Sequence, residues 1–317
     1  MSEAAQTDRP SVDVGVVTWN TAEATADALR RLLDSDQGVD LRLLVRDNAS
    51  TDDTVATLRR LVPEADIDAG AENLGFSGGV NTLLRRSTAP WFFLLNSDAW
   101  PLPGAIERLV RTAQRHPTAA AVVPRIEYPD GSLQHSTHPF PSLRVAALVN
   151  FAWDRLSKER AEELYLEGAW LHDRPRRVDW AHGAAMLIPR AAIEQIGGFD
   201  ERFFFYGEDL EWCWRAHTLG REIRFEPAAV VHHMKSLSGT KLLGDARTAT
   251  HLSNSLRFYR RAHGAPAAAA WWTLNTAGSV LRLARAVRQR DREGAIVWRS
   301  YVRAQLRAPF AKQGMRR

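Results

Sequence analysis

Two adjacent carboxylates follow an aromatic run in the second half of the chain. Glu208 and Asp209 come directly after the apolar residues 203–206 and Gly207, at the point where a helical pattern begins. Carboxylates beside Phe and Tyr side chains are costly to desolvate, and such groups often have shifted pKa values and act as acids or bases. The segment therefore predicts an acid or base at residues 208–209.

A third acidic residue follows a strand-like run. Asp98 ends the segment Leu94-Leu-Asn-Ser-Asp98. Mg²⁺ and Mn²⁺ favour carboxylate oxygens and leave positions open for phosphate, so Asp98 suits a divalent metal. Asn96 offers an amide in place of a second acid, and a nucleotide diphosphate would have to complete the metal's shell. The alternative for Asp98 is a turn residue at the end of a strand.

Two histidines could add a metal ligand. His232 and His233 follow the strand-like residues 228–231 and enter a polar loop. A neutral imidazole is a common metal ligand. A packed or surface histidine is the alternative for each of them.

Two polar segments could hold a nucleotide. Asp47 and Asn48 follow a strand-like run, and residues 73–79 read Asn-Leu-Gly-Phe-Ser-Gly-Gly. Their side chains and backbone could bind a base and a ribose by hydrogen bonds. The glycine-rich residues lack the Walker lysine and do not match GxGxxG, so a flexible turn is the alternative there.

Strands and helices alternate along the first 123 residues. Apolar β-branched runs predict strands, helical spacing predicts helices, and Thr51 or Asp52 is the expected cap of the second helix. This alternation predicts an α/β fold with a Rossmann-like, mostly parallel central sheet flanked by helices. Ligands bind such sheets at the carboxyl ends of the strands, which puts Asp47, the glycine-rich loop 75–79 and Asp98 on one rim. The expected strands are 12–18, 41–45, about 67, 91–95 and 120–123, and the expected helices are 21–33, 55–61, about 80–86 and 103–116.

Length and composition indicate the domain organisation. The chain has 317 residues and is 45% apolar, which is enough for one large domain plus an appendage. A single cysteine, Cys213, excludes an intramolecular disulfide and fits a reducing cytosol. Residues 1–10 are polar, do not resemble a signal peptide and are expected to be disordered. We expect a catalytic domain at residues 11–245 and a basic helical extension at 246–317.

The extension is strongly basic. Residues 251–317 contain 14 Lys and Arg and 2 Asp and Glu, a net charge of +12. This predicts an acidic partner, and anionic lipid is favoured over nucleic acid because no nucleic-acid motif accompanies the charge. A solvated helix face is the alternative. The uncharged run 264–281, with Trp271 and Trp272, favours a helix lying among lipid headgroups, although an ordinary packed helix also fits.

Taken together, these segments resemble glycosyltransferase family 2, the inverting, metal-dependent nucleotide-sugar transferases with the GT-A fold. The resemblance covers roughly residues 12–240 in the family's order. Within the family, residues 130–132, Trp180 with Gly183, and the two histidines are most similar to bacterial rhamnosyltransferases that act on N-acetylglucosaminyl-diphosphate-polyprenol. The shared pieces are residues 17–20, 47–52 and 73–76, Asn81, residues 96–98 and 197–200, Glu208, Asp209, Arg215, His233 and Ser238.

The resemblance implies a role for each matching residue. Asp209 would be the catalytic base, and Asp98 with His233 would bind Mg²⁺ or Mn²⁺. His233 is preferred to His232 because it keeps the family's spacing from Pro227 and Ser238. The donor-binding residues would be Thr18, Asn20, Asp47, Asn73, Gly75, Asn81, Asn96 and Asp98, and the acceptor side would hold Trp180, Gly183, Glu208 and Trp212.

The resemblance also implies partners and a location. The donor would be dTDP-rhamnose or a UDP-sugar, and the acceptor a polyprenyl-linked or other glycan. The enzyme would work in the cytoplasm, peripherally on the inner face of the membrane, and a homodimer is compatible with it.

The sequence departs from the family's pattern at two positions. Asn96 replaces the first acid of the usual acidic triplet, and Glu211 stands where Asp is more common.

Two other classes compete with this interpretation. A non-catalytic nucleotide-sugar or glycan-binding module would explain Asn96 as a loss of metal competence. A Rossmann-type oxidoreductase would need GxGxxG after the first strand, where the chain reads Thr18-Trp-Asn-Thr21.

Overall fold

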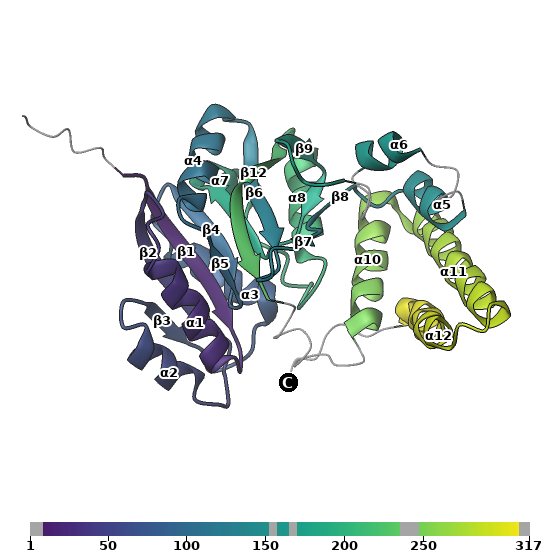
Figure 1. Cartoon of the computed structure of the whole chain (residues 1–317), viewed down its shortest axis with the longest axis horizontal. Helices are drawn as coiled ribbons and strands as arrows, with labels where there is room; N and C mark the ends of the chain where they lie inside the picture. Colours follow the sequence, from purple (N-terminus) through teal and green to yellow (C-terminus); the bar gives the residue numbers. More distant parts are fainter. Residues whose placement is uncertain (1–8, 152–156, 165–169, 235–246, 311–317) are drawn as a thin grey trace, which may run out of the picture.

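A computed structural model describes residues 9–151, 157–164, 170–234 and 247–310 (Figure 1). Most of the expected disordered N-terminus, the domain boundary expected at 245/246 and Ser238 lie outside these residues. Among the residues described, no helix is long and apolar enough to cross a membrane.

A ten-stranded sheet forms the centre of the molecule in the order β3-β2-β1-β4-β11-β6-β12-β5, with β7 beside β6 and β9 beside β12. Four neighbouring strands are parallel: β1 (Ser11–Thr18), β2 (Asp40–Asp47), β3 (Asp66–Ala69) and β4 (Trp91–Asn96). β11 (Ala185–Pro189) lies antiparallel between β4 and β6 (Ala119–Glu127), so β6 and its parallel neighbour β12 (Glu222–His233) also run in the direction of β4. The short strands β5 (Ala99–Pro101), β7 (Leu133–Gln134) and β9 (Arg176–Val178) run the other way. The α/β class with a mostly parallel sheet is therefore confirmed.

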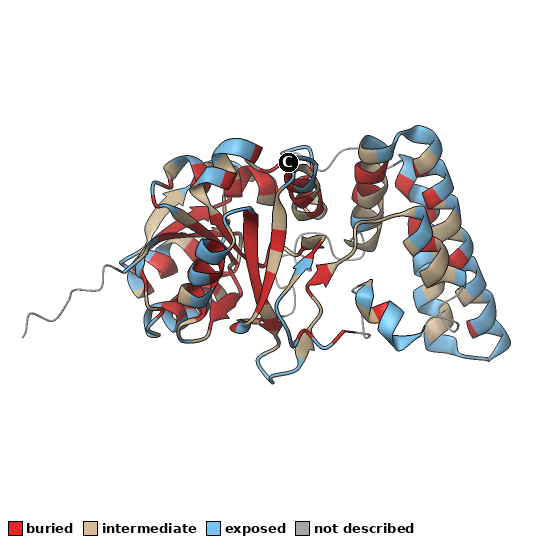
Figure 2. Ribbon diagram, turned by 90° about the horizontal axis from the view of Figure 1, so that it is seen from above, coloured by how far each residue is buried: buried red, intermediate tan, exposed pale blue. Residues whose placement is uncertain are grey.

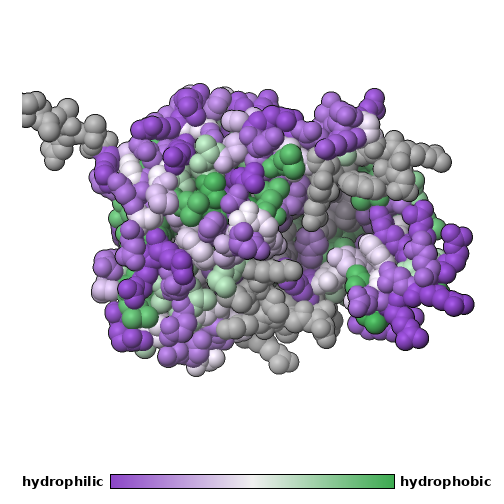
Figure 3. All heavy atoms as spheres, in the orientation of Figure 1, coloured by the Kyte–Doolittle hydropathy of each residue, from purple (hydrophilic) through white to green (hydrophobic). Residues whose placement is uncertain are grey.

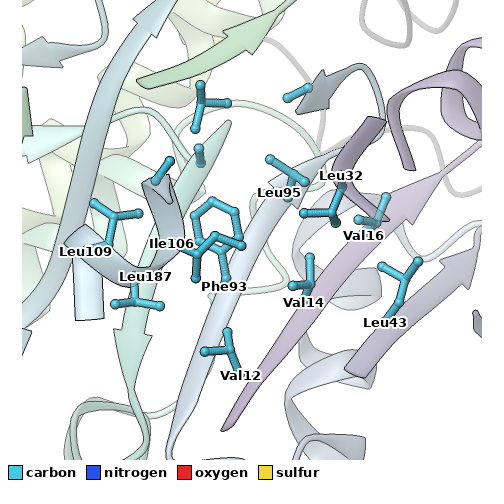
Figure 4. Close-up of a cluster of buried hydrophobic side chains, with 14 of the residues drawn as sticks. Val12, Val14, Val16, Leu32, Leu43, Phe93, Leu95, Ile106, Leu109 and Leu187 are labelled. Carbon is cyan, nitrogen blue, oxygen red and sulfur yellow. The ribbon is translucent and has the colours of Figure 1, made fainter. Parts of the chain in front are cut away.

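Helices cover both faces of this sheet. Side chains alternate along each strand, so Phe93 and Leu95 join one apolar cluster while Phe92 and Leu94 join the other. The first cluster, shown in Figure 4, packs β1, β2 and β4 against α1 (Ala22–Leu33), α2 (Thr54–Leu61) and α4 (Ala105–Arg115). The second packs the opposite face against α3 (Gly75–Arg86), α7 (Arg190–Ile196) and α8 (Glu208–Thr218). The sheet is accordingly buried on both sides (Figure 2).

Two local predictions differ from the structure. The glycine-rich residues 75–79 form the first turn of α3 and are not a loop. Gly75 has a φ of +72°, and a Cβ there would lie 2.4 Å from the carbonyl oxygen of Phe204, so glycine allows both the turn and the close approach. The N-cap of α2 is Asp53, while Asp52 accepts a hydrogen bond from the backbone N–H of Thr54.

The C-terminal helices form a separate layer beside the sheet (Figure 1). A third apolar cluster joins this layer to α8 through Leu210 and the preceding Phe203. The layer contains α10 (Arg247–His263), α11 (Ala265–Arg288), α12 (Arg292–Arg307) and the 3-10 turn η3 (Ala308–Phe310). The neighbouring middle segment adds α5 (Leu143–Phe151), α6 (Lys158–Glu163) and the paired strands β8 (Thr137–His138) and β10 (Trp180–Ala181).

The two tryptophans of α11 pack within this layer. Trp271 is 9% exposed and stacks on Tyr259 with ring centroids 5.1 Å apart. Trp272 donates a hydrogen bond from Nε1 to the carbonyl oxygen of Gln305 over 2.8 Å. The favoured interpretation of these indoles as headgroup anchors is therefore wrong, and the packed-helix alternative describes them.

Candidate active site

The aromatic run before α8 ties this helix to α3. The carbonyl oxygen of Phe204 accepts from the N–H of Phe76 over 2.8 Å, and the carbonyl oxygen of Phe203 accepts from the hydroxyl of Ser77 over 2.6 Å. Gly207, with a φ of +92°, then turns the chain into α8. The start of α8 is thus fixed beside the N-terminal turn of α3, where donor-binding residues are expected.

Two hydrogen bonds, made by the adjacent residues 183 and 184, connect Asp209 to the end of β4. Its Oδ2 accepts a hydrogen bond from the N–H of Gly183 over 3.1 Å. The next residue, Ala184, accepts from the N–H of Asn96 over 2.9 Å. Since Asp98 is two residues beyond Asn96, both predicted acids lie in the same region of the rim. The residue Asp209 is half-buried.

Burial raises the pKa values of both carboxyls at the start of α8. For Asp209, the N–H groups of Gly183 and Leu210 oppose this rise. Glu208 is more deeply buried, and burial together with the charge of Asp209 raises its pKa well above the usual range. Among the described residues, its Oε2 has no hydrogen-bond partner. Because the pKa rise is larger for Glu208, we expect Asp209 to ionise first.

This order of ionisation predicts a pH profile. A general base works only when deprotonated, so activity at saturating metal should fall on acidification at a pH above the 3.8 of an ordinary aspartate. Glu208→Gln mimics the neutral neighbour and should leave this acid limb in place. The measurement is kcat against pH for both proteins. A fall of kcat at the pH where an unperturbed carboxyl titrates would show that burial does not raise the pKa of Asp209.

Asp98 and His233 meet at the ends of β4 and β12. Nε2 of His233 lies 3.2 Å from Oδ1 of Asp98 and 3.2 Å from Nδ2 of Asn96. Nδ1 of His233 lies 2.8 Å from Oε1 of Gln134, which can accept its hydrogen, and this contact turns Nε2 toward Asp98. A hydrogen bond on the other ring nitrogen is the usual support of a metal-binding histidine.

This donor set fits a divalent metal. Asp98 and His233 are 4% and 6% exposed and offer one carboxylate and one imidazole. Within the described ranges no group of three or more His, Cys, Asp and Glu side chains could hold a metal by itself. Oxygens of a diphosphate would have to complete the shell. His232 instead packs edge-on against Trp100, with ring centroids 5.7 Å apart.

The predicted nucleoside residues gather at the ends of β1 and β2. Asp47 accepts from the N–H and hydroxyl of Ser50, over 2.9 and 2.5 Å. Asn20, with a φ of +51°, accepts from the N–H of Thr51 over 2.8 Å. Asn48 donates to the carbonyl oxygen of Gly75 over 2.9 Å, and this bond joins the end of β2 to α3. These contacts shape the rim, and direct donor contacts by Asp47 and Asn20 stay predictions.

Asn73 lies just before α3. Its Oδ1 accepts from the N–H of Gly75 over 2.9 Å, so it orders the first turn of the helix.

Thr18 and Asn81 have structural partners in place of the predicted donor contacts. Thr18 is 1% exposed, and its hydroxyl lies 2.9 Å from that of Thr21 and 3.0 Å from that of Thr25. A direct contact of Thr18 with the nucleoside is therefore wrong for this structure. Asn81 binds both backbone polar groups of Phe199, over 2.7 and 2.8 Å, so its amide holds the turn at 197–200.

Trp212 does not lie on the acceptor side. It is 1% exposed, stacks on Phe199 with ring centroids 5.7 Å apart, and donates from Nε1 to the carbonyl oxygen of Gly197 over 3.0 Å. The prediction failed because α8 turns this side chain into the second apolar cluster. Trp180, by contrast, is half-buried, stacks on His138 and lines a cavity together with His251.

Truncating Trp212 should therefore affect stability. Trp212→Ala should lower the free energy of unfolding by about 3–5 kcal/mol, because it removes a buried indole and leaves a cavity. Urea unfolding measures this loss. Trp212→Phe should keep the KM for acceptor unchanged, and a large rise in that KM would restore the acceptor role.

The sequence analysis did not identify several residues that lie near Asp209 and His233. Gln134 orients His233 from 99 positions away. His182 lies 3.0 Å from His138 between their Nε2 atoms, and burial lowers the pKa of His182 to about 3. Burial also lowers the pKa of His251, while the charge of Asp209 opposes this change. These contacts join residues that are far apart in the chain, so no local sequence pattern predicts them.

Comparison with known proteins identifies relatives of this chain. Residues 13–169 match the model of "Glycosyl transferase family 2". An N-acetylglucosaminyl-diphospho-decaprenol L-rhamnosyltransferase of Mycobacterium tuberculosis is 30% identical over 249 residues, which cover 73% of this chain and 79% of the relative. A pre-mycofactocin glycosyltransferase from the same species is 32% identical over 215 residues, covering 66% of this chain and 40% of that protein.

A solved structure supports the fold. The mannosyltransferase PcManGT from Pyrobaculum calidifontis, in complex with GDP-Man and Mn²⁺, aligns with a TM-score of 0.58 at 18% identity. The alignment covers 96% of this chain and 86% of the mannosyltransferase.

Proposed function

The chain belongs to glycosyltransferase family 2, and we propose that it transfers L-rhamnose from dTDP-rhamnose to a hydroxyl of a lipid-linked or other glycan in cell-envelope polysaccharide synthesis. The observation that carries this proposal is the carboxylate of Asp209, whose pKa burial raises and which two short hydrogen bonds link to the end of β4 beside Asp98. The similarity to the mycobacterial rhamnosyltransferase supports the sugar and the lipid-linked acceptor.

The reaction is a single displacement at the anomeric carbon. Asp209 takes the proton from an acceptor hydroxyl as that oxygen forms a bond to the anomeric carbon. The bond from this carbon to the diphosphate breaks, and the nucleoside diphosphate leaves with the electron pair. One displacement inverts the anomeric configuration. The N–H groups of Gly183 and Leu210 hold the carboxylate in place during the transfer.

Asp98 and His233 are the residues that would hold Mg²⁺ or Mn²⁺. When bound, the cation would act as a Lewis acid that offsets the charge growing on the diphosphate. Gln134 contacts Nδ1 of His233 and orients the ring, and Asn96 lies 3.2 Å from Nε2 of the same imidazole.

A panel of nucleotide sugars tests this function. Purified protein is incubated with each donor, Mg²⁺ or Mn²⁺, and a short-chain prenyl-diphosphate N-acetylglucosamine, and nucleotide release and product are followed. The expected result is metal-dependent transfer, with dTDP-rhamnose preferred to UDP-sugars. Absence of turnover with every donor would contradict the enzymatic function, and a preferred UDP-sugar would contradict the rhamnose assignment alone.

The extension 246–317 supports a peripheral contact with anionic membrane at the inner face. Its helices are hydrophilic over much of the face in Figure 3. They also expose apolar side chains beside arginines, and these are Val287 at 57%, Ile296 at 67%, Val297 at 50% and Phe310 at 84%. Apolar and cationic groups on one surface bind anionic headgroups.

Vesicle sedimentation measures this contact. The protein should bind vesicles containing anionic lipid and bind neutral vesicles less. The double variant Ile296→Ser, Val297→Ser should bind anionic vesicles more weakly with unchanged donor turnover. Equal binding to both vesicle types would exclude an electrostatic contact.

A further inference from the structure

A cavity of about 670 Å³ lies between the C-terminal helices and the segment that contains β8 and α5. One part of its wall is apolar, with Val145, Ala146 and Val149 of α5 facing Trp271 of α11. The remaining wall adds Pro139, Pro141 and Ser142, the polar residues His138, His251, Asn275 and Arg282, and Trp180. Such a mixed wall fits a ligand with both an apolar and a polar part.

Arg282 is the one arginine in this wall. Its guanidinium donates to Oδ1 of Asn150 and to the carbonyl oxygen of Val149, both over 2.7 Å, and lies 5.1 Å from the ring centroid of Trp298. Burial, and next the nearby charge of Arg285, lower its pKa. Arg282 forms no ion pair with a carboxylate of the described residues. A partly buried, oriented guanidinium without an acidic partner is suited to an anionic ligand, and phosphate matches its fork of donors.

The cavity lies near the catalytic base, although Asp209 is not one of the residues that line it. His251 lines it and is close enough to Asp209 for the carboxylate's charge to affect the histidine's pKa. On another side, His138 of the wall contacts His182, which directly precedes Gly183, the residue that donates to Asp209. A ligand that extends past His251 or His138 would therefore approach Asp209 from the side of the C-terminal helices.

We infer that this cavity is the acceptor site, and that Arg282 binds the phosphate of a saccharide carried on a lipid phosphate. The saccharide lies toward His251 and Asp209, and the start of the lipid chain lies along the apolar residues of α5 and Trp271. This inference rests on the proposed function and adds to it a binding site and a residue that selects acceptors by their phosphate. The lipid-linked acceptor would thus be held by α11, far along the chain from Asp209.

The test compares the KM values of two arginine variants of α11 for two acceptors. Arg282→Gln and its control Arg285→Gln each remove one positive charge, but Arg285 is exposed and does not line the cavity. The acceptors are N-acetylglucosamine on a short prenyl diphosphate and the same sugar as an alkyl glycoside without phosphate. Arg282→Gln should raise the KM for the diphosphate acceptor about 10- to 100-fold, the loss typical of a hydrogen bond to a charged group. It should leave the KM for the alkyl glycoside and donor hydrolysis unchanged.

Two further variants separate binding from folding. Arg282→Lys keeps the charge and should recover part of the affinity for the diphosphate acceptor. Val145→Trp fills the apolar side and should raise the KM for both acceptors, again with donor hydrolysis retained.

The inference fails if Arg282→Gln and Arg285→Gln have equal effects, or if Arg282→Gln weakens both acceptors equally. It also fails if Arg282→Gln loses donor hydrolysis, because the residue would then support the fold and not the acceptor. Absence of metal-dependent donor turnover in the unmodified protein would instead refute the proposed function.

Discussion

Replacing Asp209 with asparagine should lower kcat about 10²–10⁴-fold, the usual contribution of a general base. Asparagine has nearly the same shape, and its side-chain oxygen can still accept the N–H of Gly183, so the site should keep its geometry. The amide, however, cannot take the acceptor's proton. Initial rates with saturating donor and acceptor measure the effect, and calorimetric titration with nucleoside diphosphate and Mn²⁺ should give an affinity close to that of the unmodified protein.

Glu208→Gln is the matched control for Asp209→Asn. It makes the same chemical change one residue earlier, at a carboxyl whose raised pKa keeps it neutral when Asp209 ionises. Its kcat should therefore stay within a few-fold of the unmodified value. A severe loss in Glu208→Gln with little loss in Asp209→Asn would move the base to Glu208.

Removing a ligand of the proposed metal should have the second largest effect. Asp98→Asn takes away the carboxylate that faces His233, so the Mn²⁺ concentration for half-maximal activity should rise more than the roughly 10–100-fold typical of losing an outer hydrogen-bond partner. Gln134→Leu, which removes only the support of His233, should fall in that smaller range. Activity as a function of free Mn²⁺ measures both changes.

The two adjacent histidines provide the control for the metal site. His233→Gln should resemble Asp98→Asn, whereas His232→Gln should leave the metal dependence nearly unchanged because His232 packs against Trp100. If His232→Gln has the larger effect, the assignment of the imidazole ligand is wrong.

The sequence predicted the site residues that lie at the ends of strands. Asp98 follows β4 and His233 ends β12, and the antiparallel pairing of β12 with β5 places His233 opposite Ala99, the residue after Asp98. The pairing of Asp98 with His233 was predicted from resemblance, and the structure brings the two side chains within 3.2 Å. The resemblance was less reliable for side-chain direction. Trp212 sits three residues after Asp209 on α8, yet its indole packs into the core.

The acceptor cavity could not be predicted in this way. Its wall combines α5, β8, β10, α10 and α11, whose packing depends on contacts between residues more than 100 positions apart, such as Asn150 with Arg282. The sequence showed the basic charge of the extension and the tryptophans of α11. It did not show that Trp271 would pack inward or that Arg282 would face a cavity, because both depend on tertiary packing.

The most direct test of the shared site is a crystal structure with Mn²⁺ and a nucleoside diphosphate. Anomalous scattering locates the Mn²⁺ independently of any assumption about its ligands. The account predicts one Mn²⁺ bonded to the carboxylate of Asp98, to Nε2 of His233 and to the diphosphate, with the terminal phosphate on the side of Asp209. Mn²⁺ and diphosphate bound away from Asp98, or an Asp209 carboxylate that faces away from the terminal phosphate, would contradict it.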